Sequence, residues 1–435
     1  MDSEVQGVLE SMARQFAIPE FYKSPIISRV KKARQIRDAK KRDLSPSVID
    51  FGPVRFLLAR HFGFCFGVEN AIEIAYKTLE EYPKHRIFFL SEMIHNPDVN
   101  ADLIGRGVQF IFTPAGEQQI SWDNLQSEDI VVVPAFGTTL EIQQELSDRG
   151  IDPYTYNTTC PFVEKVWNRS ADLGQEGCTV VVHGKAAHEE TRATFSHSIR
   201  SAPTVIVLNL DEANRLADVI REKLSRDDFF ELFEDRCSAG FDPGRDLGRI
   251  GVVNQTTMLA SETREIARVV REALKYRYGA ANIKNHFADT SDTLCYATNE
   301  NQNATYALID HGADLALVVG GYNSSNTSHI VELCEDAMPT YFIKNANEVN
   351  PNQIRHFVLE TLQVTATEGW LPEKRPLNVI LTCGASCPDA IVDGVLTRVL
   401  SFFEKTRTVE SVLEPYPSQL EMQESGRVIL EESSG

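Results

Sequence analysis

Three cysteines stand where an apolar, strand-like run passes into a helix-like pattern. Cys65 lies in "LLARHFGFCFGVENAIEIAYKTL", Cys160 in "YNTTCPFVEKVW" and Cys295 in "DTSDTLCYATNENQ". The last two share the pattern [Asn/Asp]-Thr-x-Cys, and the three are 95 and 135 positions apart. This repetition predicts one α/β unit used three times. Each unit presents a thiol at the carboxyl edge of its sheet, where such folds bind ligands.

The start of a helix suits a reactive thiol. It presents unpaired backbone N–H groups and the positive end of the helix dipole, which favour thiolate over thiol. Three converging thiolates would suit an iron–sulfur cluster or zinc, but none of the three belongs to a compact CxxC pair, which argues against a zinc finger. In a four-iron cluster, three thiolates leave one iron open to substrate. Buried structural cysteines are the alternative, which a single such position would favour.

Small polar side chains gather at several other predicted strand ends. Hydroxyls, amides, imidazoles and helix N-termini can together bind phosphate. Any one of them is more often a helix cap or a turn residue. Their number predicts one shared pocket, formed by His95, Asn96, His183, His188, Glu190, Thr256, Thr257, Ser324, Ser325, Asn326 and Ser386.

The elements that must position these residues alternate between strand and helix. Strand candidates such as "VRFLLA", "IVVVPAF", "TVVVHG", "RIGVVNQ", "LALVVGG" and "LNVILTCG" are separated by helical patterns, which predicts α/β architecture with largely parallel sheets. The expected domains are an N-terminal extension (1–50), three α/β domains (51–157, 158–290 and 291–408) and a C-terminal tail (409–435). A charged helical insertion is expected at about 211–246 in the second domain.

Composition excludes some classes of protein. The 435-residue chain carries a net charge of −19, which argues against a nucleic-acid-binding body. No apolar run approaches the roughly 20 residues of a membrane span, and the N-terminus lacks the apolar core of a signal peptide. A cytoplasmic location is therefore expected. Arg29 to Asp43 is a dense basic run, interpreted first as a solvated helix or mobile arm and second as a docking arm for an acidic partner.

The ordered motifs resemble a known family, the 4-hydroxy-3-methylbut-2-enyl diphosphate reductases (IspH/LytB), in the style of its cyanobacterial and plastid branch. The matching stretches are "GFCFGVENAI", "IHNP", "TTCPFVEKV", "HEET", "NQTT", "DTLCYAT", "GGYNSSNTSHI" and "GASCPDAIVDGVL". The resemblance implies three pseudo-threefold-related α/β domains arranged as a trefoil around one [4Fe-4S] cluster. It implies that Cys65, Cys160 and Cys295 hold the cluster and that one iron stays open.

The resemblance also implies an activity, the last step of the non-mevalonate isoprenoid pathway. The substrate's hydroxyl would be removed reductively to give isopentenyl and dimethylallyl diphosphates, with ferredoxin or flavodoxin as electron donor. Glu190, His188 and Thr256 would be catalytic, with Glu190 supplying protons. The substrate would be bound by His95, His188, Thr256, Thr257, Ser324, Ser325, Asn326 and Ser386.

The chain departs from the family pattern at a few positions. Many bacterial members have a histidine where this chain has Phe136, and His183 is a candidate to compensate. Cys383 and Cys387 replace small residues and are interpreted as lining the site. The remaining cysteines, Cys178, Cys237 and Cys334, are interpreted as structural.

Two other functions remain open at this point. One is a non-catalytic diphosphate-binding sensor that uses its cluster to detect redox state or iron, which would not need Glu190. The other is a cluster dehydratase or synthase of similar build, which would need no external electrons.

Overall fold

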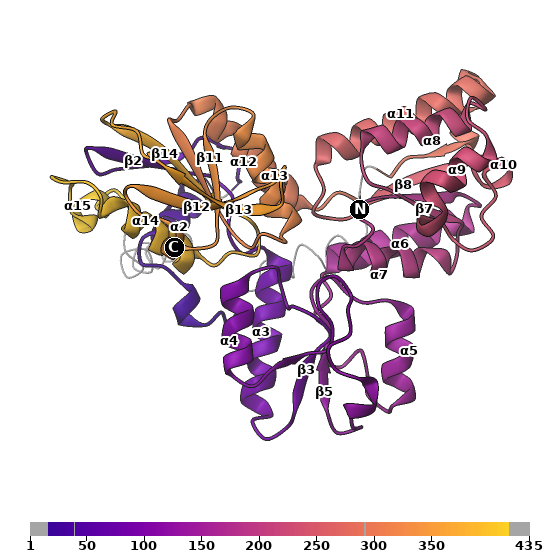
Figure 1. The fold of residues 1–435 in the computed structure, drawn as a ribbon, viewed down its shortest axis with the longest axis horizontal. Helices are drawn as coiled ribbons and strands as arrows, with labels where there is room; N and C mark the ends of the chain where they lie inside the picture. Colours follow the sequence, from indigo (N-terminus) through magenta and orange to yellow (C-terminus); the bar gives the residue numbers. More distant parts are fainter. Residues whose placement is uncertain (1–15, 39, 291–292, 417–435) are drawn as a thin grey trace, which may run out of the picture. The chain divides into compact units, whose positions relative to one another are not determined.

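A computed structural model describes residues 16–38, 40–290 and 293–416 (Figure 1). The chain divides into two compact units, each described by itself. The first unit consists of Phe16, Phe66–Ile94 and Asp98–Asn299, and the second of Ala17–Cys65, His95–Pro97 and the chain from Glu300 onward. Residues 1–15 of the predicted extension, 417–435 of the predicted tail, and Asp292 lie outside the described residues.

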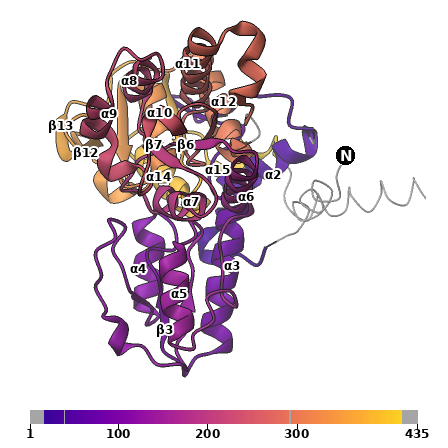
Figure 2. The ribbon, with the colours of Figure 1, turned by 90° about the vertical axis from the view of Figure 1, so that its right-hand side faces the viewer.

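The first unit begins with a small parallel sheet in the order β4-β3-β5. Its strands are short, and helices pack around them (Figure 1; Figure 2). The strands are β3 (Ile87–Phe89), β4 (Gln109–Phe110) and β5 (Ile130–Val132), and the helices are α3 (Phe66–Glu81), α4 (Pro97–Gly105), η2 (Trp122–Asn124) and α5 (Leu140–Asp148).

The second sheet of this unit is also parallel, in the order β7-β6-β8-β9. Its strands are β6 (Thr179–His183), β7 (Thr204–Val207), β8 (Ile250–Asn254) and β9 (Phe287–Ala288). Both faces are covered, since Val181 belongs to the apolar core shared with α8 (Leu210–Ile220) and α11 (Ala260–Tyr278). Its neighbours Val180 and Val182 belong to the core shared with α6 (Pro161–Gln175) and α7 (Glu189–Ile199). Burial on both faces explains why these strands are continuous apolar runs.

The predicted charged insertion is helical in the structure. It contains most of α8, followed by α9 (Arg226–Phe233), η3 (Glu234–Arg236) and α10 (Pro243–Asp246). Phe229 and Phe233 of α9 are fully buried in the same core as α8 and α11. The segment after α11 continues as η4 (Ala280–Asn285).

The second unit is built on a seven-stranded sheet in the order β1-β2-β14-β10-β11-β12-β13. The four strands from β2 to β11 are parallel, and the outer strands are antiparallel. The strands are β1 (Ser47–Asp50), β2 (Val54–Leu58), β10 (Leu315–Val319), β11 (Thr340–Ile343), β12 (Gln353–Val358), β13 (Gln363–Glu368) and β14 (Leu377–Cys383). The helices are α12 (Tyr296–His311), which begins in the first unit, α13 (Ser325–Glu335), η6 (Ala346–Glu348), α14 (Asp389–Leu400) and α15 (Val409–Leu413).

The α/β class with largely parallel sheets is confirmed, but strand membership differs from the expected boundaries. The run "VRFLLA" was expected in the first α/β domain, whereas β2 pairs with β14 in register Leu58 to Leu381. The sheet edge that carries Cys65 is therefore the one that carries the "TCGASCPD" loop.

The basic run forms α2 (Ile27–Arg37), preceded by η1 (Glu20–Tyr22). The interpretation of a solvated helix or arm was wrong for one face, because Ile27, Val30 and Ala33 are buried. Ile27 and Val30 belong to the apolar core of the second unit. Only this narrow apolar stripe marks the contact, and the surrounding charges conceal it in the sequence. No helix in the described part of the chain is long and apolar enough to cross a membrane.

Candidate active site

Cys160 occupies the N-cap position of α6, with Pro161 as the first helical residue. Proline suits this position because its missing N–H would have no helical partner there. A Cβ built on Gly67, near the start of α3, would lie 2.5 Å from Cys160 Sγ. Only glycine at 67 lets the thiol sit against that turn, and Gly67 follows Cys65 by two positions.

Cys295 directly precedes α12, as the sequence predicts. Burial raises the pKa of its thiol, and hydrogen bonds from the N–H groups of Thr298 and Ala297 act in the opposite direction. The helix start therefore favours thiolate as expected, but desolvation outweighs it. The negative charge of Glu190 also raises this pKa, so the carboxylate and the thiol interact electrostatically.

The starts of α6 and α12 lie together in the first unit. The rings of Phe162 and Tyr296, two residues after Cys160 and one after Cys295, have centroids 4.9 Å apart. Cys65 belongs to the second unit, where its N–H donates to the Ala385 carbonyl at 3.4 Å. Among the described residues, no group of three or more His, Cys, Asp or Glu side chains is arranged to hold a metal ion. All three cysteines stand at helix starts, and thiolate sulfur is the donor type that fits iron–sulfur ligation.

The backbone and the side chain of Thr256 both hydrogen-bond to the carboxylate of Glu190. The Thr256 N–H donates to Oε1 at 2.5 Å, and its hydroxyl donates to Oε2 at 3.0 Å. Glu190 is 1% exposed, and it lies in the first turn of α7, where the helix dipole favours a carboxylate. A buried carboxyl bonded to a hydroxyl is arranged to hold a proton and pass it on.

His188 caps the same helix, and its Nδ1 accepts from the Glu190 N–H at 3.2 Å. With Nδ1 accepting, the neutral ring carries its proton on Nε2 and can donate from there. Phe136 packs edge-on against the ring, with centroids 5.6 Å apart. The phenyl that replaces the expected histidine therefore buttresses His188.

His183 fits the structural interpretation. It is fully buried, its Nδ1 lies 2.8 Å from the Thr263 hydroxyl, and Glu262 lies 3.6 Å from its Nε2. These contacts fix the end of β6 against α11. Nδ1 is thus engaged, whereas the buried Nε2 has no hydrogen-bond partner among the described residues. Compensation for Phe136 by His183 stays a prediction.

In the second unit, α13 begins at the carboxyl end of β10. Ser324 caps it, accepting from the N–H and the hydroxyl of Thr327 at 3.3 and 2.9 Å. Ser325 and Asn326 follow in the buried first turn. Unpaired N–H groups at such a turn favour an anion.

Asn326 supplies a second sign of a ligand. Its Oδ1 accepts from the Ala385 N–H at 2.9 Å, which identifies the other amide atom as Nδ2. Nδ2 is buried without a hydrogen-bond partner among the described residues, and Asn326 is only 4% exposed. A buried donor without a partner is costly unless a ligand satisfies it.

His95 and Ser386 join the same cluster. The Ser386 hydroxyl donates to the His95 carbonyl at 3.1 Å, and Asn323 Nδ2 lies 3.2 Å from His95 Nδ1. An amide donating to Nδ1 leaves the His95 proton on Nε2. A Cβ on Gly321 would lie 2.4 Å from the His95 carbonyl, so this close approach requires glycine. Neighbouring parallel strands β10 and β14 bring these loops to one sheet edge.

Several residues that position the site were not among the predicted ones. Asn254 Oδ1 accepts from the Thr293 hydroxyl at 2.8 Å and so fixes the segment before Cys295. Gln255 accepts from Thr191 and donates to the Thr257 hydroxyl at 2.6 Å. Asn254 and Gln255 begin the "NQTT" motif, which was the available signal. Asn323 and Thr327 lie in the "GGYNSSNTSHI" motif, which was the available signal there.

The other cysteines differ in burial. Cys178, Cys334, Cys383 and Cys387 are buried, and Cys237 is half-buried. Burial raises the pKa of the Cys334 thiol to about 12. Cys383 ends β14 inside the core of the second unit, and Cys387 belongs to the same core.

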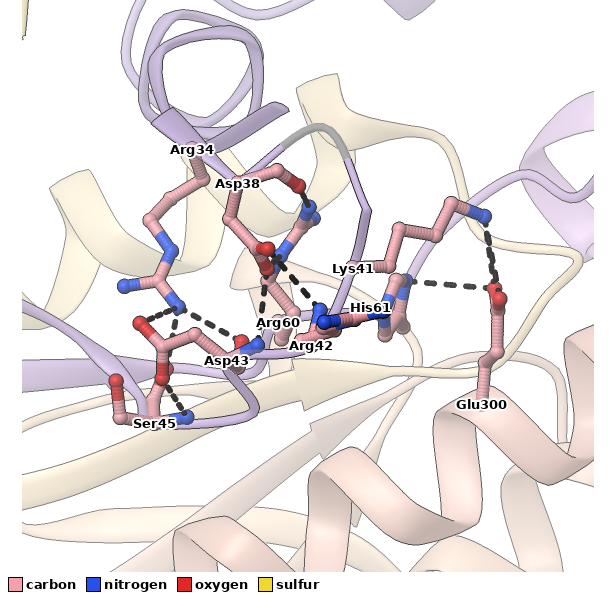
Figure 3. A network of polar contacts seen from close by, with 9 residues as sticks. All are labelled: Arg34, Asp38, Lys41, Arg42, Asp43, Ser45, Arg60, His61 and Glu300. Carbon is pink, nitrogen blue, oxygen red and sulfur yellow. Dashed lines mark hydrogen bonds and ion pairs between the residues drawn. The ribbon is translucent and has the colours of Figure 1, made fainter. Parts of the chain in front are cut away.

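Much of the basic run is engaged within the second unit (Figure 3). Arg34 bonds the carbonyls of Asp43 and Ser45, and Lys41 pairs with Glu300 at 3.1 Å. Outside the figure, Arg29 donates to the Tyr416 carbonyl. These contacts weaken the interpretation of the run as a docking arm.

Comparisons with known proteins agree with the motifs. The LytB protein family matches residues 56–400. A 4-hydroxy-3-methylbut-2-enyl diphosphate reductase of Synechococcus sp. is 42% identical over 350 residues, covering 80% of this chain and 85% of the relative. One of Synechocystis sp. is 40% identical over 365 residues, covering 83% and 93%. The structure of the Plasmodium falciparum E-1-hydroxy-2-methyl-but-2-enyl-4-diphosphate reductase covers 80% of this chain and 87% of its own, with a TM-score of 0.56 and 20% identity. This last likeness supports the fold.

Proposed function

The chain belongs to the LytB family, and from this premise we propose that it is a 4-hydroxy-3-methylbut-2-enyl diphosphate reductase. The reaction breaks the allylic C–O bond with two electrons and two protons. One proton leaves with the oxygen as water, and the other is added to carbon to give isopentenyl or dimethylallyl diphosphate. The observation that carries the proposal is the buried Glu190–Thr256 pair beside Cys295, because hydroxide leaves poorly unless an acid protonates it.

The second unit would bind the diphosphate. The first turn of α13 offers backbone N–H groups, and Asn326 Nδ2 is a buried donor in need of an acceptor. We assign further contacts to Ser324, Ser325, Ser386 and the Nε2–H of His95. Neutral donors suit this role because they bind an anion without leaving a charge buried when the site is empty.

The first unit would bind the alcohol end. His188 would donate from Nε2 to the hydroxyl, held in orientation by Phe136 and by the Glu190 N–H. Glu190 would deliver the proton, directly or through the Thr256 hydroxyl. Thr257, whose hydroxyl accepts a hydrogen bond from Gln255, would contact the substrate from the loop after β8.

We assign Cys65, Cys160 and Cys295 as ligands of a [4Fe-4S] cluster. When bound, the cluster supplies the electrons and a Lewis-acidic iron for the leaving oxygen. A metal replaces the thiol proton outright, which removes the cost that burial imposes on the Cys295 thiolate. The proposed donor is ferredoxin or flavodoxin, and the cytoplasmic location stays a prediction.

The proposal is tested by turnover under anaerobic conditions. Purified protein with reduced methyl viologen and the hydroxylated diphosphate should yield both five-carbon diphosphates, measured by mass spectrometry. Glu190→Gln should lose turnover while keeping its iron and its affinity for substrate. Iron-loaded protein that binds the substrate but forms no product would favour a sensor. Turnover without any reductant would favour a dehydratase or synthase.

A further inference from the structure

A groove of about 450 Å³ lies beside α11 in the first unit. Its floor is largely apolar and comes from β8, α11, η4 and β9, through Val252, Ala267, Ile283 and Phe287. Thr290 and Leu294, which flank the residues before Cys295, also line the groove.

Cations line the rim of this groove. Arg264, Arg268 and Arg271 are exposed at helical spacings of four and three residues on α11, so they share one face. Lys284, on η4, also lines the groove. Arg268 pairs with Glu265, at 2.5 Å. The side chains of Arg264, Arg271 and Lys284 form no ion pair or hydrogen bond within the described residues. Asp289 is the one acid among the lining residues, so the rim is positive in a chain of net charge −19.

The groove also lies close to a proposed cluster ligand. Leu294, which lines it, is bonded through one peptide to Cys295. The Thr293 hydroxyl fixes this segment to Asn254 of β8. Electron tunnelling falls off exponentially with distance, so a carrier that contacts Leu294 would be one residue away from the proposed cluster ligand Cys295.

We propose that this face, the α11 groove, is the docking site of a small acidic electron-carrier protein, which transfers electrons through the Leu294–Cys295 segment. The inference rests on the proposed function. From Arg264 to Arg271 the helix rises by about 10 Å, too far for one phosphate group to reach both and well suited to a row of carboxylates. Charge complementarity of this kind speeds association and orients the partner.

The test compares two variants that lose the same charge. Arg264→Gln/Arg271→Gln/Lys284→Gln removes three cations from the groove, and Lys32→Gln/Lys40→Gln/Arg42→Gln removes three exposed cations of the basic run. Turnover is driven either by an acidic [2Fe–2S] ferredoxin or by reduced methyl viologen. Ferredoxin binding to the iron-loaded protein is titrated separately at low salt.

The groove variant should raise the KM for ferredoxin at least about tenfold, weaken its binding equally and flatten the salt dependence. Its turnover with viologen and its iron content should stay at wild-type level, and the basic-run variant should behave as wild type. Equal effects of the two variants, or a larger effect of the basic-run variant, would overturn the docking site. If the wild type itself showed no viologen-driven turnover, that result would count against the proposed function. The binding titration would still test the docking site.

Discussion

At the scale of single residues, the chemistry depends on which atoms already have partners. Glu190 is satisfied at both oxygens by Thr256, whereas Asn326 has one satisfied atom and one buried donor without a partner. The first arrangement stabilises a carboxylate beside a hydroxyl through which a proton can pass. The second is a buried donor that lacks an acceptor among the described residues. Substitutions beside Glu190 should therefore lower turnover, whereas substitutions at Asn326 should weaken the binding of the diphosphate.

Thr256→Val removes the hydroxyl that bonds Glu190 Oε2 and leaves the backbone N–H bond in place. We expect viologen-driven turnover to fall about 100-fold, the usual range for loss of a positioned proton-transfer group, with little change in KM. Thr256→Ser keeps the hydroxyl and should retain most activity. Wild-type turnover in Thr256→Val would show that the hydroxyl has no part in proton transfer.

Asn326→Asp preserves the acceptor for the Ala385 N–H but replaces the free donor with a negative charge. The KM for the diphosphate should rise by about 100-fold or more, because one hydrogen bond is lost and like charges meet. Asn347→Asp, at an exposed position of η6, is the matched control. Unchanged KM values in both variants would remove Asn326 from the anion site.

His61 gives the fold a dependence on pH. Burial, with Arg60 and Lys41 nearby, lowers its pKa from 6.5 to about 4, while Glu300 and Asp38 act in the opposite direction (Figure 3). The unfolded chain therefore binds more protons than the folded one between these values. The resulting stability is complete above pH 6.5 and is lost as the pH falls toward 4.

We expect this loss to be of the order of 2 kcal/mol. His61→Gln should flatten the pH dependence of the urea midpoint between pH 4 and 6.5 while leaving the midpoint above pH 7 nearly unchanged. A wild-type slope that survives in the variant would assign the dependence to other groups.

The sequence predicted which residues stand at the site better than it predicted their pKa values and long-range contacts. The cysteine turns and helix caps follow local rules, so Cys160 and Ser324 stand where expected. The raised pKa of Cys295 depends on burial by distant segments, which no local pattern contains. The contact of Phe136 with His188 joins positions 52 apart and was equally invisible.

At the scale of elements, α2 is attached to the loops of the site in the second unit. Lys31 pairs with Asp389 at 2.7 Å and lies over the Phe62 ring, 4.6 Å from its centroid. A Cβ on Gly63 would lie 2.8 Å from the Lys31 amine. Ser28 donates to the other oxygen of Asp389, at the start of α14. The helix therefore supports both the turn before Cys65 and the loop that carries Ser386.

Lys31→Met keeps the aliphatic stem and removes the ion pair with Asp389, which is only 16% exposed. We expect a destabilisation of about 1–2 kcal/mol and faster loss of iron under a chelator. Lys32→Met, at the exposed neighbour, should change neither quantity. Equal iron-loss rates in the two variants would show that α2 does not support the Cys65 turn.

Element types were more predictable than their pairing. Continuous apolar runs correctly indicated buried parallel strands such as β6, β8 and β10. The parallel partner of β2 is more than 300 residues away, in β14, and pairing at that separation leaves no periodic pattern in the sequence. The buried apolar face of α2 was also missed, because Arg and Lys make up much of the helix and mask its few apolar residues.

At the scale of the whole molecule, the two units contribute different parts of the proposed reaction. The second unit contains Cys65 and Asn326, which we assign to the diphosphate, and the first contains Glu190, His188, Cys160 and Cys295. The α11 groove, where we place the electron carrier, belongs to the first unit. The ordered motifs contain the residues to which these roles are assigned, whereas the cations of the groove, Arg264, Arg268, Arg271 and Lys284, lie outside every motif.

The most direct test of the central claim is Mössbauer spectroscopy on iron-57-labelled protein prepared without oxygen, with and without the hydroxylated diphosphate. Three thiolate ligands and an open site predict that one iron of four has distinct parameters and that these change when substrate is added. A protein without a cluster, or one with four equivalent irons that ignore the substrate, would contradict the account. Cys65, Cys160 and Cys295 would then be structural cysteines at helix starts.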